Sequence, residues 1–238
     1  MCGNGIRIEW PRTEEGRART VITRSGAHRR YMVPCFRGGL REAHGDAPEE
    51  RDAFILLDAC AGVEFQEQPA RILFEWRGTQ HEHFPDILVL AQSIKEFWEC
   101  KKDQESLDLE VRRRTERLTE LLSPLGFGYR LITTSQLDQE RLIENAIRMR
   151  RRATLMIPDH VSRRINKLGL DAPAIPAARL FGSYPRDLDD HISLLYACLY
   201  QGVLTGNLRE PISIDMDVMR PSLKEVKPWV WQLFDQIN

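Results

Sequence analysis

Residues 84–90 are apolar at every position except Pro85 and Asp86, a pattern that indicates a strand buried on both faces. A carboxylate in such a strand is costly to bury without a compensating charge or hydrogen bonds. A second short segment, residues 96–101, places charges among aromatic side chains and ends in Glu99-Cys100-Lys101, with twelve residues between Asp86 and Glu99. We therefore expect two neighbouring strands that bring these charged groups together.

Strand geometry predicts which of these groups meet. Side chains two residues apart on a strand point to the same face, so Glu99 and Lys101 project together while Cys100 faces the other way. If the neighbouring strand presents Asp86 to that face, two carboxylates and one ammonium group meet at one place. Two carboxylates can hold Mg²⁺, or Mn²⁺ in its place, and leave positions for water and a phosphate oxygen. A lysine can orient that water, so the set suits phosphodiester hydrolysis.

The surrounding sequence predicts a mixed α/β domain. Asp46 followed by Pro48 indicates the start of a helix, and Leu107 and Leu118 mark the apolar stripe of a later one. Strands on both sides of a crossover helix imply a mixed sheet with helices on its faces. The expected elements are a helix over 46–59, strands over 70–76, 84–90 and 96–101, a helix over 103–122 and a strand over 129–133.

The sequence after residue 137 has a different texture, with short helices followed by a hairpin. These are the parts of a winged-helix-like domain. Helices are expected over 138–152, 159–168, 176–181 and 188–201, and hairpin strands over 202–207 and 212–218. The predicted domains are an Arg-rich irregular arm over 1–45, the α/β domain over 46–136, the winged-helix-like domain over 137–219 and a tail over 220–238.

Composition excludes several classes of protein. Of the 238 residues, 42% are hydrophobic and 29% are charged, which excludes disordered and fibrous chains. No apolar run approaches the roughly 20 residues of a membrane span, so we expect no membrane association. The five cysteines are scattered, which predicts reduced thiols and a cytoplasmic location rather than disulfides or a zinc site.

Charge is unevenly distributed along a chain whose net charge is only −1. Residues 1–41 hold nine arginines and three acidic residues, and residues 111–167 hold thirteen basic and six acidic residues. Residues 42–110 are the reverse, with seventeen acidic and six basic residues. An acidic block between basic blocks fits a carboxylate-rich metal site flanked by phosphate-binding surfaces, although solvated helix faces explain any single run equally well.

Two resemblances to known families follow from these motifs. Pro85-Asp86 with Glu99-Cys100-Lys101 matches the PD-(D/E)xK pattern of restriction-endonuclease-like nucleases, and the expected order of elements matches the core of that fold. A wider set of motifs comprises Glu50-Arg-Asp with Leu57-Asp58, Val63-Glu-Phe-Gln-Glu-Gln68-Pro69, His81-x-His83-x-Pro85-Asp86-Ile-Leu-Val89, and Gly202-Val-Leu with Leu208-Arg-Glu-Pro211. Together these motifs resemble the TnsA family, the endonuclease subunits of heteromeric transposases.

The TnsA resemblance implies a catalytic set and partners. It implies that the core helix supplies a third acidic ligand, Glu50, to the metal held by Asp86 and Glu99. The chain would cut the 5′ (non-transferred) strand at transposon ends, with a DDE-type transposase subunit for the other strand and an AAA+ ATPase that regulates assembly. Double-stranded DNA is the expected substrate, and the candidate phosphate contacts are Lys102, Arg112, Arg113, Arg114, Arg148, Arg150, Arg151 and Arg152.

Several residue roles remain alternatives at this point. Glu49 could take the place of Glu50. Gln68 could position a water molecule or Lys101, or could satisfy backbone groups at the start of a strand. His81 and His83 could contact DNA phosphate or a metal ion. Glu99 and Lys101 could also be no more than a cross-strand ion pair.

Two other functions share the same motifs. A stand-alone restriction or repair nuclease would use the same catalytic core, with residues 137–219 reading its DNA sequence. A non-enzymatic adaptor would keep the nuclease fold as a scaffold. The complete set of Asp86, Glu99 and Lys101 argues against the adaptor.

Overall fold

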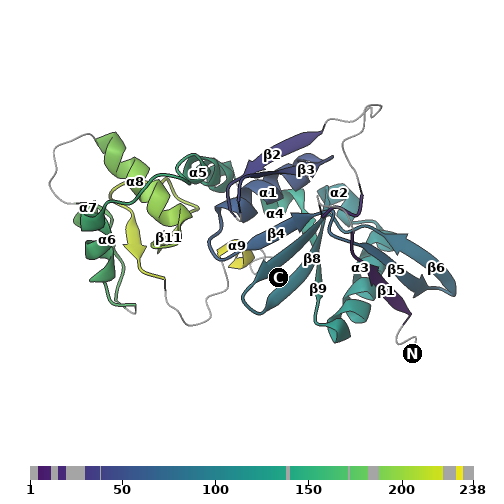
Figure 1. The fold of residues 1–238 in the computed structure, drawn as a ribbon. Helices are drawn as coiled ribbons and strands as arrows, with labels where there is room; N and C mark the ends of the chain where they lie inside the picture. The colour runs from purple at the N-terminus through teal and green to yellow at the C-terminus, as the bar shows by residue number, and fades with distance from the viewer. Residues whose placement is uncertain are drawn as a thin grey trace. The chain divides into compact units, whose positions relative to one another are not determined.

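The computed structural model describes residues 5–11, 16–19, 30–37, 39–137, 140–170, 172–181, 188–221 and 229–232, which form a mixed α/β structure with several sheets (Figure 1). The chain divides into two compact units. The first takes in the chain up to Leu57 together with Val63–Asp138, and the second takes in Asp58–Gly62 together with the chain from Gln139 onward. Among the described residues, no helix is long and apolar enough to cross a membrane.

The first unit contains most of the strands. Its strands are β1 (Ile6–Glu9), β2 (Tyr31–Cys35), β3 (Arg41–Gly45), β4 (Glu64–Glu67), β5 (Arg71–Trp76), β6 (Thr79–His83), β7 (Ile87–Ala91), β8 (Ile94–Lys101) and β9 (Gly128–Thr133). Its helices are α1 (Pro48–Ala59, the last two residues of which belong to the second unit), α2 (Asp103–Ser106), α3 (Leu109–Leu122), the 3₁₀ turn η1 (Ser123–Leu125) and α4 (Thr134–Leu137).

The central sheet has the strand order β4-β7-β8-β9. Strand β7 runs antiparallel to β4 and β8, while β9 runs parallel to β8. A parallel pair needs a crossover connection, which α2, α3 and η1 supply between β8 and β9. The mixed sheet is confirmed, and α1, β7, β8 and β9 correspond to the helix predicted at 46–59 and the strands predicted at 84–90, 96–101 and 129–133. The prediction that Asp86 lies within a strand was wrong, because β7 begins at Ile87 and Asp86 occupies the bend before it.

Strand 70–76 is present as β5, but it lies in a second sheet of order β1-β5-β6. The main core packs this sheet, the central sheet and α3 together, and it includes Phe74, Leu88, Phe97, Leu118 and Tyr129. Elsewhere, Phe54 of α1 stacks on Phe65 of β4 with ring centroids 5.6 Å apart. Apolar contacts therefore hold in place the strands that position the polar side chains of the segment 84–101.

The structure of this unit differs from the sequence predictions in several places. The arm over 1–45 is not irregular throughout, because its described residues contain β1 and the β2–β3 hairpin. Strands β4 and β6 were not predicted. The helix expected over 103–122 is interrupted where the Asp108 side chain accepts the Glu110 amide and caps α3. Leu107, expected on the apolar stripe, is 65% exposed at this break.

The second unit is mainly helical. Its elements are α5 (Glu140–Arg150), α6 (Asp159–Asn166), β10 (Ile175–Pro176), α7 (Ala178–Phe181), α8 (Leu188–Tyr200), β11 (Thr205–Gly206), β12 (Asp217–Met219) and α9 (Trp229–Gln232). Helices α5 and α8 pack together, and the buried Asn145 side chain of α5 donates to the carbonyls of Leu208 and Glu210, 2.9 Å away in each case.

The predicted helices of the second unit are present, but its sheet differs from the expected hairpin. Strands β11 and β12 pair antiparallel over fewer residues than expected at 202–207 and 212–218, and β10 adds a third strand. In the predicted tail, residues 222–228 and 233–238 lie outside the described residues. Cys35, Cys60, Cys100 and Cys198 are buried, and Cys2 also lies outside the described residues.

Arg150 was predicted to contact DNA phosphate, and this prediction was wrong. Its Nε atom lies 2.7 Å from Oδ2 of Asp58, and the two side chains are only 9% and 0% exposed. A buried arginine that already neutralises a buried carboxylate is not available to a polyanion. The pair belongs to the core of the second unit.

We expect Arg150→Ala to destabilise the second unit by about 3–5 kcal/mol, because it leaves the Asp58 carboxylate buried without its counter-charge. Chemical denaturation followed by a probe in this unit measures the change. Arg151→Ala is the matched control, since Arg151 is the exposed neighbour, and it should change stability little. Equal stability of the two variants would contradict a structural role for Arg150.

Candidate active site

An open cavity of about 560 Å³ lies in the first unit, around the carboxylates singled out from the sequence. Seven acidic and four basic side chains line it together with His83 and a few other residues. The acidic residues are Asp46, Glu49, Glu50, Glu82, Asp86, Glu99 and Glu105, and the basic residues are Arg19, Lys101, Lys102 and Arg114. The excess of negative charge favours a cation in this cavity.

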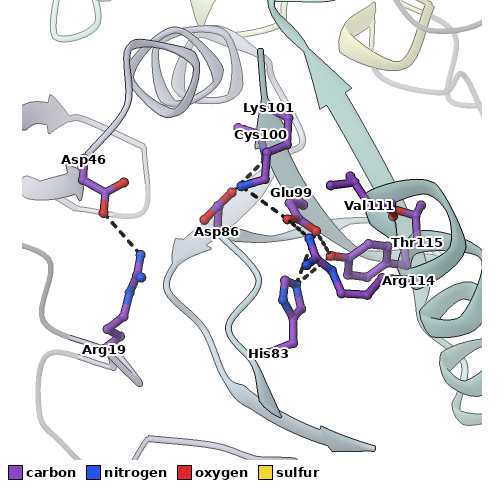
Figure 2. A network of polar contacts seen from close by, with 11 residues as sticks. Arg19, Asp46, His83, Asp86, Glu99, Cys100, Lys101, Val111, Arg114 and Thr115 are labelled. Carbon is purple, nitrogen blue, oxygen red and sulfur yellow. Dashed lines mark hydrogen bonds and ion pairs between the residues drawn. The ribbon is translucent and has the colours of Figure 1, made fainter. Parts of the chain in front are cut away.

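Asp86 lies beside the end of β8. It occupies the bend immediately before β7, where its backbone N–H donates to the carbonyl of Trp98 at 3.0 Å, and it lines the cavity together with Glu99 and Lys101. Glu99 and Lys101, two residues apart on β8, point to the same face of the strand. The Lys101 Nζ atom is 3.4 Å from Oε1 of Glu99 (Figure 2). The structure thus brings together the three residues predicted from strand alternation.

Asp86 is a buried carboxylate with limited compensation. Only 8% of it is exposed, and its Oδ2 accepts a 2.8 Å hydrogen bond from the backbone N–H of Cys100. Burial raises the pKa of Asp86 to about 6, although the Cys100 N–H and the charge of Lys101 act in the opposite direction. A further positive charge in the cavity would therefore move the pKa of Asp86 back toward its ordinary value.

Glu99 differs, because polar groups surround both of its oxygen atoms (Figure 2). Oε1 lies 2.6 Å from Nη2 of Arg114 and also faces Lys101. Oε2 accepts the hydroxyl proton of Tyr129 and lies 3.5 Å from Nε2 of His83. Burial acts to raise the pKa of Glu99, but His83, Arg114 and Tyr129 outweigh it and the net shift is downward. Glu99 is therefore held as a carboxylate.

His83 and Tyr129 form a buried polar pair behind Glu99, with 2.7 Å between Nε2 and the hydroxyl oxygen. Burial lowers the pKa of His83 to about 4, so the ring is neutral at pH 7. The Tyr129 hydroxyl has one proton, and it donates that proton in its hydrogen bond to Glu99. In the hydrogen bond between His83 and Tyr129, the N–H at Nε2 of His83 is therefore the donor and the Tyr129 oxygen is the acceptor. His83 thus contacts Tyr129 and Glu99 in the structure. A contact with a metal ion or a phosphate, the roles considered from the sequence, would have to replace this arrangement.

Glu50 reaches the same cavity from the first turn of α1. It is 2% exposed, and its Oε2 atom has no hydrogen-bond partner. Burial, together with the charge of Asp86 and a hydrogen bond to Asp46, raises the pKa of Glu50 to about 10. A Cβ atom at Gly45 would lie 3.0 Å from that Oε2 atom, so glycine makes room for the carboxylate.

Glu49 also lines the cavity, but its Oε1 accepts a 2.9 Å hydrogen bond from Thr134. Because Glu50 has an unpartnered buried oxygen whereas Glu49 is engaged, the structure favours Glu50 as the third carboxylate. This ordering agrees with the family resemblance.

Lys101 and Lys102 differ in burial. The Lys101 side chain is 30% exposed, and the attraction of Glu99 and Asp86 outweighs burial, which acts to lower the pKa, so that the pKa of Lys101 is raised. Lys102 is exposed, precedes α2 and lines the outer part of the cavity. Cys100 lies between them on the strand and is buried, as expected for a core position.

Gln68 lies beside the cavity without lining it. It is fully buried, adopts a left-handed backbone conformation with φ of 45°, and donates its backbone N–H to the carbonyl of Asp86 at 2.8 Å. Its Nε2 atom has no hydrogen-bond partner, and its Oε1 accepts from Arg19 at 3.2 Å. Gln68 therefore contacts Asp86 through its backbone and Arg19 through its side chain, and these contacts do not decide between the two predicted roles of its side chain.

The predicted phosphate contacts separate into different environments. Arg112 and Arg113 are exposed on α3, whereas Arg114 turns into the cavity toward Glu99. In the second unit, Arg148 pairs with Glu144, Arg151 is exposed, and Arg152 stacks over Tyr196. Arg114 is thus better described as a site residue than as a surface contact.

A divalent cation suits part of this arrangement. Among the described residues, no three histidine, cysteine, aspartate or glutamate side chains are already arranged to hold a metal ion. Burial nevertheless raises the pKa values of Glu50 and Asp86, to about 10 and about 6, and Glu50 has a buried oxygen without a hydrogen-bond partner. Oxygen-rich carboxylates are the ligands that Mg²⁺ prefers. Glu99 could join them only if Arg114 moved away from Oε1.

These pKa shifts predict how stability depends on pH. Without divalent cations, the free energy of unfolding should fall as pH rises from about 5 to about 9. Over that range the unfolded chain has largely lost the Glu50 proton, because its ordinary pKa is 4.5, while the folded protein retains the proton up to about pH 10. The raised pKa of Asp86 acts in the same direction below about pH 6.

Thermal unfolding in EDTA at several pH values measures this trend. Glu50→Gln should flatten the dependence, and saturating Mg²⁺ should do the same for the wild-type protein. Glu105→Gln, an exposed position in the same cavity, should follow the wild type. A Glu50→Gln variant with the full wild-type pH dependence would contradict the assignment.

The sequence does not match any family model, nor any curated protein.

Proposed function

We propose that the protein is a Mg²⁺-dependent DNA endonuclease with a restriction-endonuclease-like core. The observation that carries this proposal is the convergence of Asp86, from the bend before β7, with Glu99 and Lys101 of β8 at an open cavity, with Glu50 entering from α1. Three buried carboxylates, of which Glu50 and Asp86 have raised pKa values, with a lysine beside them, suit hydrolysis of a phosphodiester better than they suit a structural ion pair.

Glu50 and Asp86 are the residues that would hold the cation, and Glu99 would join them on release from Arg114. When bound, a divalent cation would neutralise charge on the phosphate and favour ionisation of an attacking water. The Lys101 ammonium group projects into the same cavity, where it can orient that water and stabilise charge developing on the phosphate oxygens. Tyr129 and His83 hold the Glu99 carboxylate in place. Glu99 in turn pairs with Lys101 and would keep it near the reacting phosphate.

We further propose, on the TnsA resemblance, that the chain is the endonuclease subunit of a heteromeric transposase and cuts the 5′ (non-transferred) strand at transposon ends. A DDE-type transposase subunit would cut and join the other strand. The helical second unit, with its small three-stranded sheet, is then the winged-helix-like domain that contacts DNA or the AAA+ regulator. Exposed Arg112, Arg113 and Arg151 supply candidate phosphate contacts.

A nicking assay tests the nuclease proposal. We expect the full chain to nick supercoiled plasmid slowly in Mn²⁺ and not at all in EDTA. Asp86→Asn should remove the activity, because an amide is a poorer ligand for a hard cation than a carboxylate. Asp52→Asn is the control, since Asp52 pairs with Arg51 away from the cavity. Nicking that persists in EDTA, or in Asp86→Asn, would refute the proposal.

A further inference from the structure

A short segment near the N-terminus, residues 16–19, is held against the edge of the central sheet. The backbone N–H of Ala18 donates to the carbonyl of Gln68 at 2.7 Å. Arg17 donates to Oε1 of the buried Glu67 at 2.8 Å and to the carbonyl of Glu42 at 2.7 Å. These contacts fix the segment immediately before Arg19.

Arg19 projects from this segment into the cavity (Figure 2). Its Nε donates to Oε1 of Gln68 at 3.2 Å, and its Nη2 lies 3.4 Å from Oδ2 of Asp46. In Figure 2, Arg19 lies on the opposite side of Asp86 from Glu99 and Arg114. The carboxylates of the cavity thus have cations on two sides.

The contact with Asp46 is too weak to account for the placement of Arg19. A charge-assisted hydrogen bond between guanidinium and carboxylate is typically about 2.7–2.9 Å long. The observed 3.4 Å pair joins side chains that are 43% and 42% exposed, and such pairs contribute little to stability. Arg19 can therefore exchange Asp46 for a better anion at small cost.

An anion that enters this cavity meets Arg19 directly. Burial raises the pKa values of Glu50 and Asp86, and the positive charge of Arg19 acts against that shift in both groups, so its field reaches the carboxylates. Gln68 holds Nε of Arg19 and so directs the rest of the guanidinium toward the cavity. A planar guanidinium is well suited to binding phosphate oxygens.

We propose that Arg19 binds a non-bridging phosphate oxygen of the DNA strand that lies in this cavity, on the side away from Arg114. The inference rests on the proposed nuclease function, and it assigns the N-terminal segment a direct part in holding the substrate. Gln68 is the positioning residue for this contact.

A binding experiment tests Arg19 without requiring cleavage. Fluorescence anisotropy with a labelled random-sequence DNA duplex, in Ca²⁺ and over a range of salt concentrations, compares the full chain with Arg19→Ala and Arg19→Lys. Arg19→Ala should weaken binding by roughly 3- to 10-fold and reduce the slope of log K against log salt by about 1. Arg19→Lys should keep the slope, because it keeps the charge. Arg7→Ala, at an exposed arginine paired with Glu9 outside the cavity, should match the wild type.

The outcomes separate this inference from the nuclease proposal. If Arg19 were only a structural tie to Gln68 and Asp46, Arg19→Ala would lower the melting temperature and leave the salt slope at its wild-type value, which would overturn the inference. A chain that does not bind the duplex at all would overturn it too. If the wild type binds DNA, Arg19→Ala lowers the slope and no nicking occurs in Mn²⁺, then the inference about Arg19 stands and the nuclease proposal falls.

A cleavage experiment adds an independent readout where nicking is observed. Arg19→Ala should reduce the rate by about 10²-fold, and added guanidinium ion should restore part of it, whereas Lys101→Ala should not respond to guanidinium. A failure of guanidinium to rescue Arg19→Ala, together with an unchanged salt slope, would argue for a structural role.

Discussion

Replacing Lys101 by alanine should lower the rate of strand cleavage by about 10²–10³-fold and leave the protein folded, because the lysine stabilises charge that develops on the reacting phosphate. Its Nζ atom lies 3.4 Å from Glu99 and its side chain is 30% exposed at the cavity, so its loss opens no core. Single-turnover cleavage of an end-labelled duplex gives the rate, and circular dichroism and thermal unfolding report folding.

The adjacent lysine provides a control for which of the two lysine side chains acts in the cavity. Lys102→Ala removes the same charge one residue away, from an exposed position before α2 at the outer part of the cavity. This variant should cleave within a few-fold of the wild type. Equal loss of activity in Lys101→Ala and Lys102→Ala would show that the lysines act through general attraction of DNA rather than through a positioned ammonium group.

The residues that alternation along a strand governs could be predicted from sequence. A period of two places Glu99 and Lys101 on one face of β8, and the isolated charge in residues 84–90 marks Asp86 as a residue that needs a partner. The helix that begins at Pro48 carries Glu50 in its first turn, as the family resemblance implied. These are local patterns, so the sequence contains them directly.

Contacts between distant segments could not be predicted in this way. Arg114 comes from α3, Tyr129 from β9 and Arg19 from the N-terminal segment, and nothing in their local sequence distinguishes them from solvated or core positions. Arg150 illustrates the opposite error, since it stands in an Arg-rich run yet is buried against Asp58. The position of Tyr129 behind Glu99 depends on the parallel pairing of β8 with β9, in which Leu131 lies opposite Glu99. The sequence alone does not reveal that pairing.

The same limitation explains the errors in the first 45 residues. Strand β1 pairs with β5 over Ile6–Glu9, a partner more than sixty residues away in sequence. A segment of four residues is too short for an alternating pattern to predict a strand. Its pairing becomes favourable only after β5 has formed. Tertiary contacts thus create order where local pattern indicates none.

We expect the purified chain to be nearly inactive with Mg²⁺ on its own and to cut only together with its transposase partner. Oε1 of Glu99 lies 2.6 Å from Arg114, and this contact competes with a cation for the carboxylate. Bound DNA offers phosphate as an alternative anion for Arg114, and a partner that holds the scissile phosphate in place would favour that exchange. Activation of about 10²-fold or more by the partner is the expected result.

The test is a nicking assay with Mg²⁺ on a duplex that carries the transposon end, with and without the co-purified transposase subunit. If the neighbouring genes encode an integrase-like transposase and an AAA+ ATPase, they would identify the partner to use in this assay. Arginine–phosphate contacts alone give mostly non-specific, salt-sensitive binding, so end recognition should come from the partner. Sequence-specific double-strand cleavage by the chain alone would instead overturn the transposition proposal and favour a stand-alone restriction nuclease.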